Sequence, residues 1–582
     1  MLSDSTPAEH RQALQNEFDQ CQRKMALAKR RLNTYTLVAC FPSEVLINIF
    51  SHYQHLTREA EGDSEGRHEG RPYLWIKVTH VCFFWRHASI SAPELWTRIS
   101  VTNAACVKEM FKRVRGAKLS LKVTMSPLID DHKTLQSRIT ITQRCLAILQ
   151  RFTSVDVLAG DTQDLADLFR SANNPGQLQK LILSVVGLPG MPEPLYEGTP
   201  IPFIKKSMPH LRHLQYQGAN FQWTETALRP SLTHVDIRNT QPAGVAGFTV
   251  TQFVRALQTM PLLQSLTLVD VFASNQAECR ASPPIKLPAL QSLRIDGSVK
   301  HCANLLDCIA IPHDASVSFT VDGDIPFSRL ITVLATRLAT SGKALKSVAI
   351  TRRDSYTGSI FIALHGWTSI RALTAKHTPA NLTLSLDVRR QNSIVKATEQ
   401  LCTELPLNDV RTLRVDNISL LSKAFWTKLA SQMPALRGVR LKGHAAEGFP
   451  ETLASKPLLP SKLQTSASQA RFAALYFPRL HTILLDEVPF EMTNAQNHSF
   501  LRRLNTVIGV RRNRGTIRKV MILQGVDIVM DEVLDMKKIV PILQWDGYEL
   551  TFDDNEEVFD QFAGVGGKRG DDIEDEAAEY ES

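Results

Sequence analysis

The sequence predicts an α/β protein, in which a helical amino-terminal part is followed by a long solenoid of parallel strands and helices. Residues 37–99 carry aromatic and aliphatic side chains at helical spacing more densely than any other stretch. From about residue 117 a short pattern, L-x-x-L-x-L or a close variant, recurs ten times. Helical stretches before several copies end at a proline, which lacks the amide donor that a helix interior needs. Strands that alternate with helices in this way are typical of a repeat array.

Length and composition narrow the class of protein. At 582 residues the chain is longer than one hydrophobic core usually supports, so we expect several domains or a repeat array. The first residues are polar and lack the apolar core of a signal peptide, and no apolar run is long enough for a membrane span. Nine cysteines are scattered without a C-x-x-C pair, so no disulfide framework is expected. We therefore expect a cytoplasmic or nuclear protein that does not contact a membrane.

Residues 1–34 are predicted to contain one long polar helix with a single apolar seam. The seam follows the steps of four and three that define the a and d positions of a heptad. Its members are Leu14, Phe18, Cys21, Met25, Ala28 and Leu32. Two interpretations remain open at this point: a coiled coil that forms a dimer, or a helix that packs on the rest of the chain.

Residues 35–100 are predicted to form two or three short helices. A first helix is expected at Pro42, because proline suits a first helical turn and Glu44 suits the positive end of the helix dipole. Residues 55–71 interrupt the apolar pattern with charges and three glycines, which predicts an inserted loop. So few helical residues bury too little surface to be stable alone. The apolar excess must therefore meet the rest of the chain or a partner.

Nine residues of this region follow the spacing of a known family. They are Pro42, Leu46, Ile49, Phe50, Val78, Cys82, Trp85, Leu95 and Trp96. The region resembles the F-box in the form common in fungal F-box-like proteins, with a long insertion and with Phe41, Phe83 and Phe84 departing from the family pattern. The resemblance implies that the nine residues bind a Skp-type adaptor of a cullin–RING ligase. Trp85 and Trp96 have a second interpretation, as the core of the F-box itself.

Residues 117–550 hold the recurring pattern. The copies begin at Leu178, Leu211, Leu232, Leu263, Leu290, Leu345, Val410, Leu436, Leu480 and Ile517. In each copy the apolar side chains alternate, as in a strand with one buried face. Weaker candidate strands lie at residues 317–321 and 382–386. The array resembles the irregular leucine-rich repeats found behind F-boxes, which implies parallel strands on a concave side and helices on a convex side.

The positions between the apolar residues of each copy are predicted to face the concave side and to bind a target protein. Many of them are basic, which suggests an acidic or phosphorylated target. The candidates are Arg212, His213, His234, Arg294, Arg411, Arg414, Arg437 and Arg440.

Charge is unevenly distributed along the chain. The whole chain carries +9, yet residues 553–582 hold 12 acidic and 2 basic residues. We expect this acidic tail to be disordered. A basic body raises a nucleic-acid alternative, but no RNA- or DNA-binding motif accompanies it.

No motif predicts catalysis, a metal site or a cofactor. The resemblance therefore implies a non-catalytic substrate receptor of an SCF-type ubiquitin ligase, which holds a target on its repeats for ubiquitin-dependent degradation. The alternatives are an interaction scaffold with an F-box-like cap and a basic nucleic-acid-associated repeat protein. The sequence does not identify the target.

Overall fold

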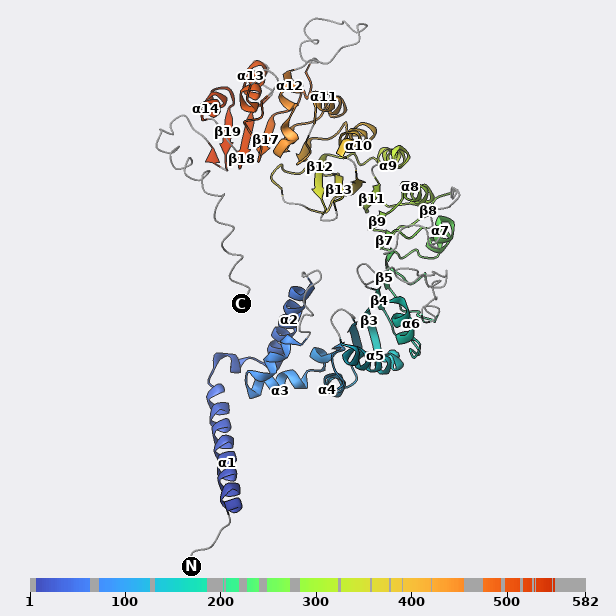
Figure 1. Ribbon diagram of the computed structural model, residues 1–582, viewed down its shortest axis with the longest axis vertical. Helices are drawn as coiled ribbons and strands as arrows, with labels where there is room; N and C mark the ends of the chain where they lie inside the picture. Colours follow the sequence, from blue (N-terminus) through green and yellow to red (C-terminus); the bar gives the residue numbers. More distant parts are fainter. Residues whose placement is uncertain are drawn as a thin grey trace, which may run out of the picture. The chain divides into compact units, whose positions relative to one another are not determined.

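The computed structural model forms two compact units, residues 1–232 and 233–582, which are described separately. The structure describes residues 7–62, 73–125, 131–185, 203, 206–218, 228–239, 249–272, 283–322, 326–355, 358–375, 378–389, 391–419, 421–454, 475–493, 498–512, 517–525, 528, 530–546 and 548–549. The acidic tail and most of the predicted insertion lie outside these ranges. Figure 1 labels the helices and strands.

The first unit begins with helices and ends with a parallel sheet. Its elements are α1 (Pro7–Asn33), η1 (Leu37–Cys40), α2 (Ser43–Gly62), η2 (Leu74–His80), α3 (Phe83–Ser91), η3 (Pro93–Trp96), β1 (Arg98–Ser100), α4 (Ala104–Val114), β2 (Leu119–Thr124), α5 (His132–Ala147), η4 (Leu149–Arg151), β3 (Phe152–Ala159), α6 (Thr162–Phe169), β4 (Lys180–Val185) and β5 (His213–Gly218). Strands β1 to β5 pair in sequence order, and each pair is parallel.

The second unit repeats strand and helix. Its elements are β6 (His234–Asn239), α7 (Val250–Gln258), β7 (Ser265–Val269), β8 (Ile285–Lys286), β9 (Ser292–Asp296), α8 (Val299–Cys308), β10 (Ile309–Ala310), β11 (Ser316–Asp322), α9 (Ser328–Ser341), β12 (Ser347–Asp354), β13 (Ile360–Trp367), β14 (Leu382–Val388), α10 (Gln391–Glu404), β15 (Thr412–Asp416), α11 (Lys423–Gln432), β16 (Gly438–Lys442), η7 (Gly443–Ala446), α12 (Phe449–Ala454), β17 (Thr482–Asp486), α13 (Phe500–Arg512), β18 (Lys519–Leu523), α14 (Met530–Ile539), β19 (Ile542–Trp545) and β20 (Tyr548–Glu549).

The sheet of the second unit is parallel except at two places. Its strands follow the order β6-β7-β9-β11-β14-β13-β12-β15-β16-β17-β18-β19-β20. Strand β13 is antiparallel to both of its neighbours, and β20 is antiparallel to β19. The prediction of parallel strands is therefore corrected at these two strands. A hairpin connection explains β13, because the chain turns directly from β12 into it instead of crossing over through a helix.

The predicted alternation sets the register of the sheet. In all ten copies of the sequence pattern the last two apolar residues lie on a strand and the first lies two residues before it, and the two weaker candidates are β11 and β14. In β14 the side chains alternate between buried and half-buried along the whole strand. Equivalent apolar residues pair across strands: Leu413 lies opposite Val439, and Val439 opposite Ile483. Because the side-chain period of a strand is two, this register puts the last two apolar residues of each copy on the same face.

The helices of each unit cover the face that the apolar side chains enter. In the second unit α7 to α14 pack against one another in sequence order, and Figure 1 shows them along one side of the strands. Helices α7 and α11 end just before Met260-Pro261 and Met433-Pro434, as the prolines predict. The structure thus confirms the predicted α/β solenoid of strands and helices.

A left-handed residue recurs where the strands of the second unit end. The residues with positive φ at this position are Asp270, Gly297, Asn417, Gly443, Glu487, Gln524 and Asp546. Asn417 and Gly443, for example, directly follow β15 and β16. The amide of Asp270 donates to Asp296 O and that of Glu487 to Leu523 O, so the sheet ladder extends into these turns. This position supplies the sharp turn that leads the chain away from each strand.

Two predicted boundaries are corrected. Helix α2 continues to Gly62, so the first residues of the expected loop at 55–71 are helical. A run of seven residues without proline, LTREAEG, lets the helix continue once packing has started it. The sheet begins before residue 117, because β1 at Arg98–Ser100 already pairs with β2. The helical segment resembling an F-box therefore passes directly into the first strand of the array.

Candidate functional site

The nine residues predicted to bind an adaptor divide by burial. Leu46, Phe50, Val78, Leu95 and Trp96 are buried inside the helical region of the first unit. Pro42 and Ile49 are exposed, and Cys82 and Trp85 are half-buried. Buried side chains cannot form a contact surface without unfolding their surroundings. The predicted contact set is therefore corrected: its buried members form the core of this region.

Aromatic contacts and hydrogen bonds hold this core together. The Trp75 and Trp96 rings pack with their centroids 4.8 Å apart, and the Trp96 indole donates to Ser89 O at 2.7 Å. Gln54 Nε2 donates to Leu95 O at 3.1 Å, which ties α2 to η3. Indole nitrogens and amides that are buried need such partners, because an unpaired polar group in an apolar core is costly. Trp96 thus follows the second interpretation of its role, as an internal core residue.

Helix α2 and the chain just before it leave a second set of apolar side chains uncovered. Phe41, Val45, Ile49, Tyr53 and Leu56 are each between 38% and 52% exposed. They are spaced by four, four, four and three residues, so they follow one side of the helix. We call these five residues the α2 stripe. Leu46 and Phe50, each one residue after Val45 and Ile49 and so about 100° further round α2, face the core on the adjacent side of the helix.

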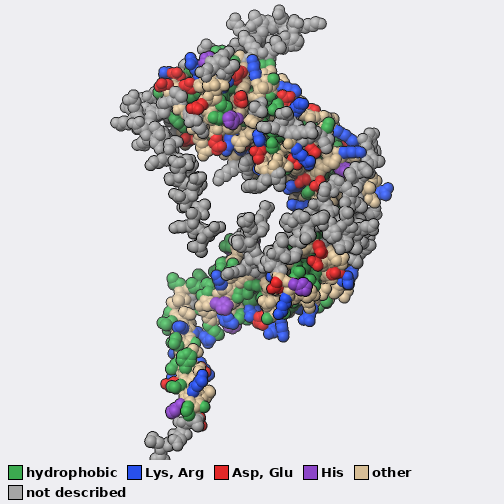
Figure 2. All heavy atoms as spheres, viewed as in Figure 1, with side chains coloured by type: hydrophobic (Ala, Val, Ile, Leu, Met, Phe, Trp, Pro, Cys, Tyr) green, Lys and Arg blue, Asp and Glu red, His purple; other side chains and the backbone are tan. Residues whose placement is uncertain are grey.

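A further apolar group lies where η2 ends and α3 begins. Val81 is 59% exposed, Phe83 50% and Phe84 37%. We call these three residues the α3 corner. Helices α2 and α3 pack against each other, and the Phe50 and Trp85 rings, 5.0 Å apart, join them. Figure 2 shows hydrophobic side chains gathered over this helical end of the first unit, whereas charged side chains are mixed among the others elsewhere. The α2 stripe and the α3 corner together are the candidate site.

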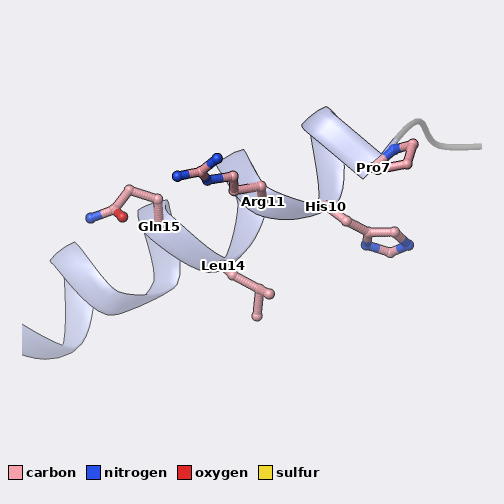
Figure 3. A pocket seen from close by; sticks show the side chains of 5 residues that line it. All are labelled: Pro7, His10, Arg11, Leu14 and Gln15. Carbon is pink, nitrogen blue, oxygen red and sulfur yellow. The ribbon is translucent and has the colours of Figure 1, made fainter.

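Helix α1 is exposed along its whole described length, and none of its residues is buried. Leu14, Phe18 and Met25 of its predicted seam are more than half exposed. Figure 3 shows its first turns, where His10 and Leu14 lie on one side of the helix and Arg11 and Gln15 on the other. The Arg30 guanidinium lies 3.3 Å from the centre of the Phe83 ring.

Arg30 occupies the f position of the predicted heptad, opposite the a and d seam. The contact of α1 with Phe83 therefore leaves the seam uncovered. The predicted dimer through this helix remains a prediction.

On the sheets, several arginines predicted to bind a target already have partners. Arg294 pairs with Asp296, and Arg414 with Asp416. Arg440 pairs with Asp486, which is only 4% exposed. The first two pairs each lie within one strand, because alternate residues of a strand share a face, and the third joins the neighbouring strands β16 and β17. These arginines are neutralised within the chain, which corrects their predicted role as free cations for an acidic target.

A segment after β13 also covers part of this face. Arg414 Nη1 donates to Ala375 O at 3.0 Å, and Arg440 Nη1 donates to Leu373 O at 3.2 Å. Gly438 has room for this segment because it carries no side chain; a Cβ there would lie 3.2 Å from Leu373 Cδ1. The face of β15 and β16 around these arginines is thus occupied by the chain itself.

The other candidates lie at or just before the first residue of a strand. Arg212 precedes β5 and is exposed, and its amide donates to Gln179 O. His213 and His234 are the half-buried first residues of β5 and β6. Arg411 and Arg437 precede β15 and β16. Sequence reasoning grouped these residues with Arg414 and Arg440, but the structure places them at a different level of the strands.

Within the described ranges, no group of histidine, cysteine and carboxylate side chains could hold a metal ion. Cys302 and Cys308 are buried in α8, and burial raises the pKa of the Cys302 thiol far above its usual range. No helix in the described part of the chain has the length and hydrophobicity of a membrane span.

The chain was compared with known proteins. No protein-family model matches it, and no curated protein sequence matches it. Among solved structures, the crystal structure of the Rad7 and Elc1 complex in yeast is similar at 10% sequence identity and a TM-score of 0.30. The similarity covers 75% of this chain and 93% of that chain.

Proposed function

We propose that this chain is the substrate-recognition subunit of an SCF-type ubiquitin ligase. In this proposal the helical region binds a Skp-type adaptor and the repeat array binds a target protein. The observation that carries the proposal is the uncovered apolar surface of the α2 stripe and the α3 corner. Eight large apolar side chains, each at least 37% exposed, lie within residues 41–84. Contiguous apolar surface of this kind marks a protein interaction site.

The chemistry of the surface suits a helical partner. A stripe at four- and three-residue spacing can pack along an amphipathic helix, as helix ridges pack into helix grooves. Phe83 and Phe84 extend the surface with two aromatic rings, and buried aromatic anchors dominate many interfaces. Few charged side chains interrupt the stripe, so its burial needs little desolvation of charge. An adaptor with an apolar helical tail would meet these requirements.

The proposed mechanism is positional and involves no catalytic group of this chain. The adaptor fixes the first unit relative to the ligase, and the array holds the target. A lysine of the target then meets the charged conjugating enzyme at a raised effective concentration. The cellular location proposed for this activity is the cytoplasm or the nucleus.

Titration of the full chain with a purified Skp-type adaptor tests the proposal. Ile49→Asp should weaken binding by about 100-fold, because it puts a charge into the buried part of the interface at a cost of roughly 2–4 kcal/mol. Ile49 is 45% exposed, so the thermal midpoint of the chain should not fall. Ile370→Asp is the matched control, since Ile370 is 51% exposed and lies after β13 in the second unit. Equal affinities of wild type, Ile49→Asp and Ile370→Asp would refute adaptor binding at this surface.

A second experiment separates a ligase receptor from a scaffold. The chain, adaptor, cullin, RING subunit and conjugating enzymes are incubated with proteins that co-purify with the array. The proposal expects ubiquitin chains on at least one of them, and expects Ile49→Asp to abolish the chains. Adaptor binding without any ubiquitin transfer would instead favour the scaffold alternative.

A further inference from the structure

The residue just before each strand forms a row at one edge of the second unit. In β12, β15, β16, β17 and β18 this position holds Lys346, Arg411, Arg437, His481 and Arg518. We call these five residues the basic ladder. It corresponds to the second position of the sequence pattern, directly after the first apolar residue.

Backbone hydrogen bonds keep the ladder in register. The amides of Arg411 and Arg437 donate to Lys346 O and Arg411 O, both at 2.8 Å. Those of His481 and Arg518 donate to Arg437 O and His481 O, both at 2.9 Å. Consecutive side chains therefore start about 4.8 Å apart, the distance between neighbouring strands. Burial, and after it the charges of Arg437 and Arg518, lower the pKa of His481, which agrees with this proximity.

The ladder differs from the arginines deeper in the same strands. Arg414 and Arg440 are paired with carboxylates. Among the described residues, no carboxylate forms an ion pair with a member of the ladder, and four of its five members are exposed; Arg411 is half-buried. The charges of the lysine and the three arginines in this row repel one another. An anionic ligand would relieve this repulsion.

The same position is neutral in the first strands of this unit. Before β6, β7 and β9 it holds Thr233, Gln264 and Gln291, joined by the same type of backbone hydrogen bond. The change from amide and hydroxyl side chains to basic ones occurs at β12 and continues to β18. The positive charge is thus confined to one stretch of the edge and is not a general property of the repeat.

We propose that the basic ladder binds an extended acidic peptide segment, and that residues 553–582 of the same chain are its occupant. These residues hold 12 acidic and 2 basic side chains. Arginines bind carboxylates with paired, charge-assisted hydrogen bonds. The match of charge is the first argument for this occupant.

The direction of the last strands is the second argument. Ile542 at the start of β19 donates its amide to Arg518 O, so β19 begins beside the ladder. Strand β20 is antiparallel to β19, with Tyr548 opposite Trp545 and Glu549 opposite Gln544. The chain at Glu549 is therefore returning to the edge that carries the ladder. Residues 550–552 separate Glu549 from the acidic tail.

Length is the third argument. Five neighbouring strands span about 19 Å, and six extended residues span about 20 Å. Residues 571–576, with the sequence DDIEDE, place five carboxylates within six residues. A tail of this length can reach the ladder, and covalent attachment gives it a high effective concentration. Because exposed ion pairs are individually weak and screened by salt, the contact should be multivalent and sensitive to salt.

The proposal goes beyond adaptor binding and does not depend on it. A tail that occupies the ladder would shield it from acidic segments of other proteins. The two proposals use different surfaces, the ladder in the second unit and the α2 stripe and α3 corner in the first. The failure of one is therefore distinguishable from the failure of the other.

The test uses a labelled peptide of residues 553–582 and three forms of the full chain. In the open form, Asp571→Asn, Asp572→Asn, Glu574→Gln, Asp575→Asn and Glu576→Gln remove the five acidic charges of residues 571–576. We expect the open form to bind the peptide about tenfold more tightly than wild type. This is the change expected if the tail occupies the basic ladder in about nine of ten wild-type molecules and no longer does so in the open form. Arg411→Gln, Arg437→Gln and Arg518→Gln, added to the open form, should weaken binding at least about tenfold. Circular dichroism checks that each form is folded.

The matched control removes the same charge from the helix side of this unit. Arg255→Gln, Lys423→Gln and Arg502→Gln, added to the open form, should leave peptide binding within about twofold of the open form. If this control weakens binding as much as the ladder variant, the attraction is a general charge effect and the proposal is wrong. It is also wrong if the open form and wild type bind the peptide equally, or if neither binds it at low salt.

Discussion

The helical region of the first unit and the sheet array of the second unit differ in how many of their large apolar side chains are exposed. In the described part of residues 35–84, eleven large apolar side chains are exposed; in that of residues 233–549, four are. The array stacks each repeat on the next, so almost every apolar residue finds a neighbour of the same chain. The helical region has too few residues to enclose its own aromatic and aliphatic content. Apolar residues therefore form the core of the array, whereas in the helical region only some of them are buried and the rest stay exposed.

Replacing one tryptophan of each region by alanine sharpens this comparison, and we expect it to give the largest change in the free energy of unfolding. Trp426 in α11 is fully buried, packs 5.0 Å from the Phe449 ring and donates to Glu447 O. Trp426→Ala should lower the free energy of unfolding by about 3–5 kcal/mol. Trp85 is half-buried beside Phe50. Trp85→Ala should therefore lower the free energy of unfolding by about half as much as Trp426→Ala does. Urea unfolding followed by circular dichroism measures both; equal losses would contradict the comparison.

Two arginines of the array test the claim that its deeper cations serve the fold. Arg440→Ala strands the buried Asp486 carboxylate without its partner, and such losses cost about 3–5 kcal/mol. Arg294 forms its pair with Asp296 at a position 47% exposed. Arg294→Ala should therefore change the free energy of unfolding by less than about 1 kcal/mol. The same urea titration applies, and a stable Arg440→Ala chain would return this residue to the list of target-binding candidates.

The smallest expected effect concerns Asp156 in β3 of the first unit. Burial raises the pKa of this carboxyl, although Lys122, Arg98 and Lys180 act in the opposite direction. With rising pH the unfolded chain loses this proton before the folded chain does, so ionisation of Asp156 disfavours the folded state.

Asp156→Asn should therefore stabilise the chain slightly at neutral pH, and the gain should disappear at acidic pH. Thermal midpoints of the two forms measured from acidic to neutral pH test this sign. A gain that grows as the pH falls would contradict the assigned cause.

The sequence predicted the array better than it predicted the site. Alternation places each leucine of the pattern on one face of a strand, so all ten copies could be located without a structure. Strand β13 was not predicted, because its antiparallel place depends on a hairpin and not on the repeat. The reason is physical: a repeat pattern records local side-chain period, whereas strand direction depends on the connection.

In the helical region the residues were recognised, but their burial was not. Leu46 and Ile49 both suit an apolar helix face, yet Leu46 is fully buried and Ile49 is 45% exposed. Only the packing of α2 against η2 and α3 decides which face is covered. Val45 and Ile49 are spaced by four residues, but so are the buried Leu46 and Phe50, so the spacing identifies both apolar faces and not which of them is open.

Amide hydrogen exchange with and without a Skp-type adaptor tests the central claim most directly. The account predicts slower exchange on adaptor binding in residues 43–56 and 81–87, because burial of the α2 stripe and the α3 corner suppresses local opening there. It predicts no change in the strands of the second unit. Unchanged exchange at α2 and α3 with the adaptor at saturation would contradict the account.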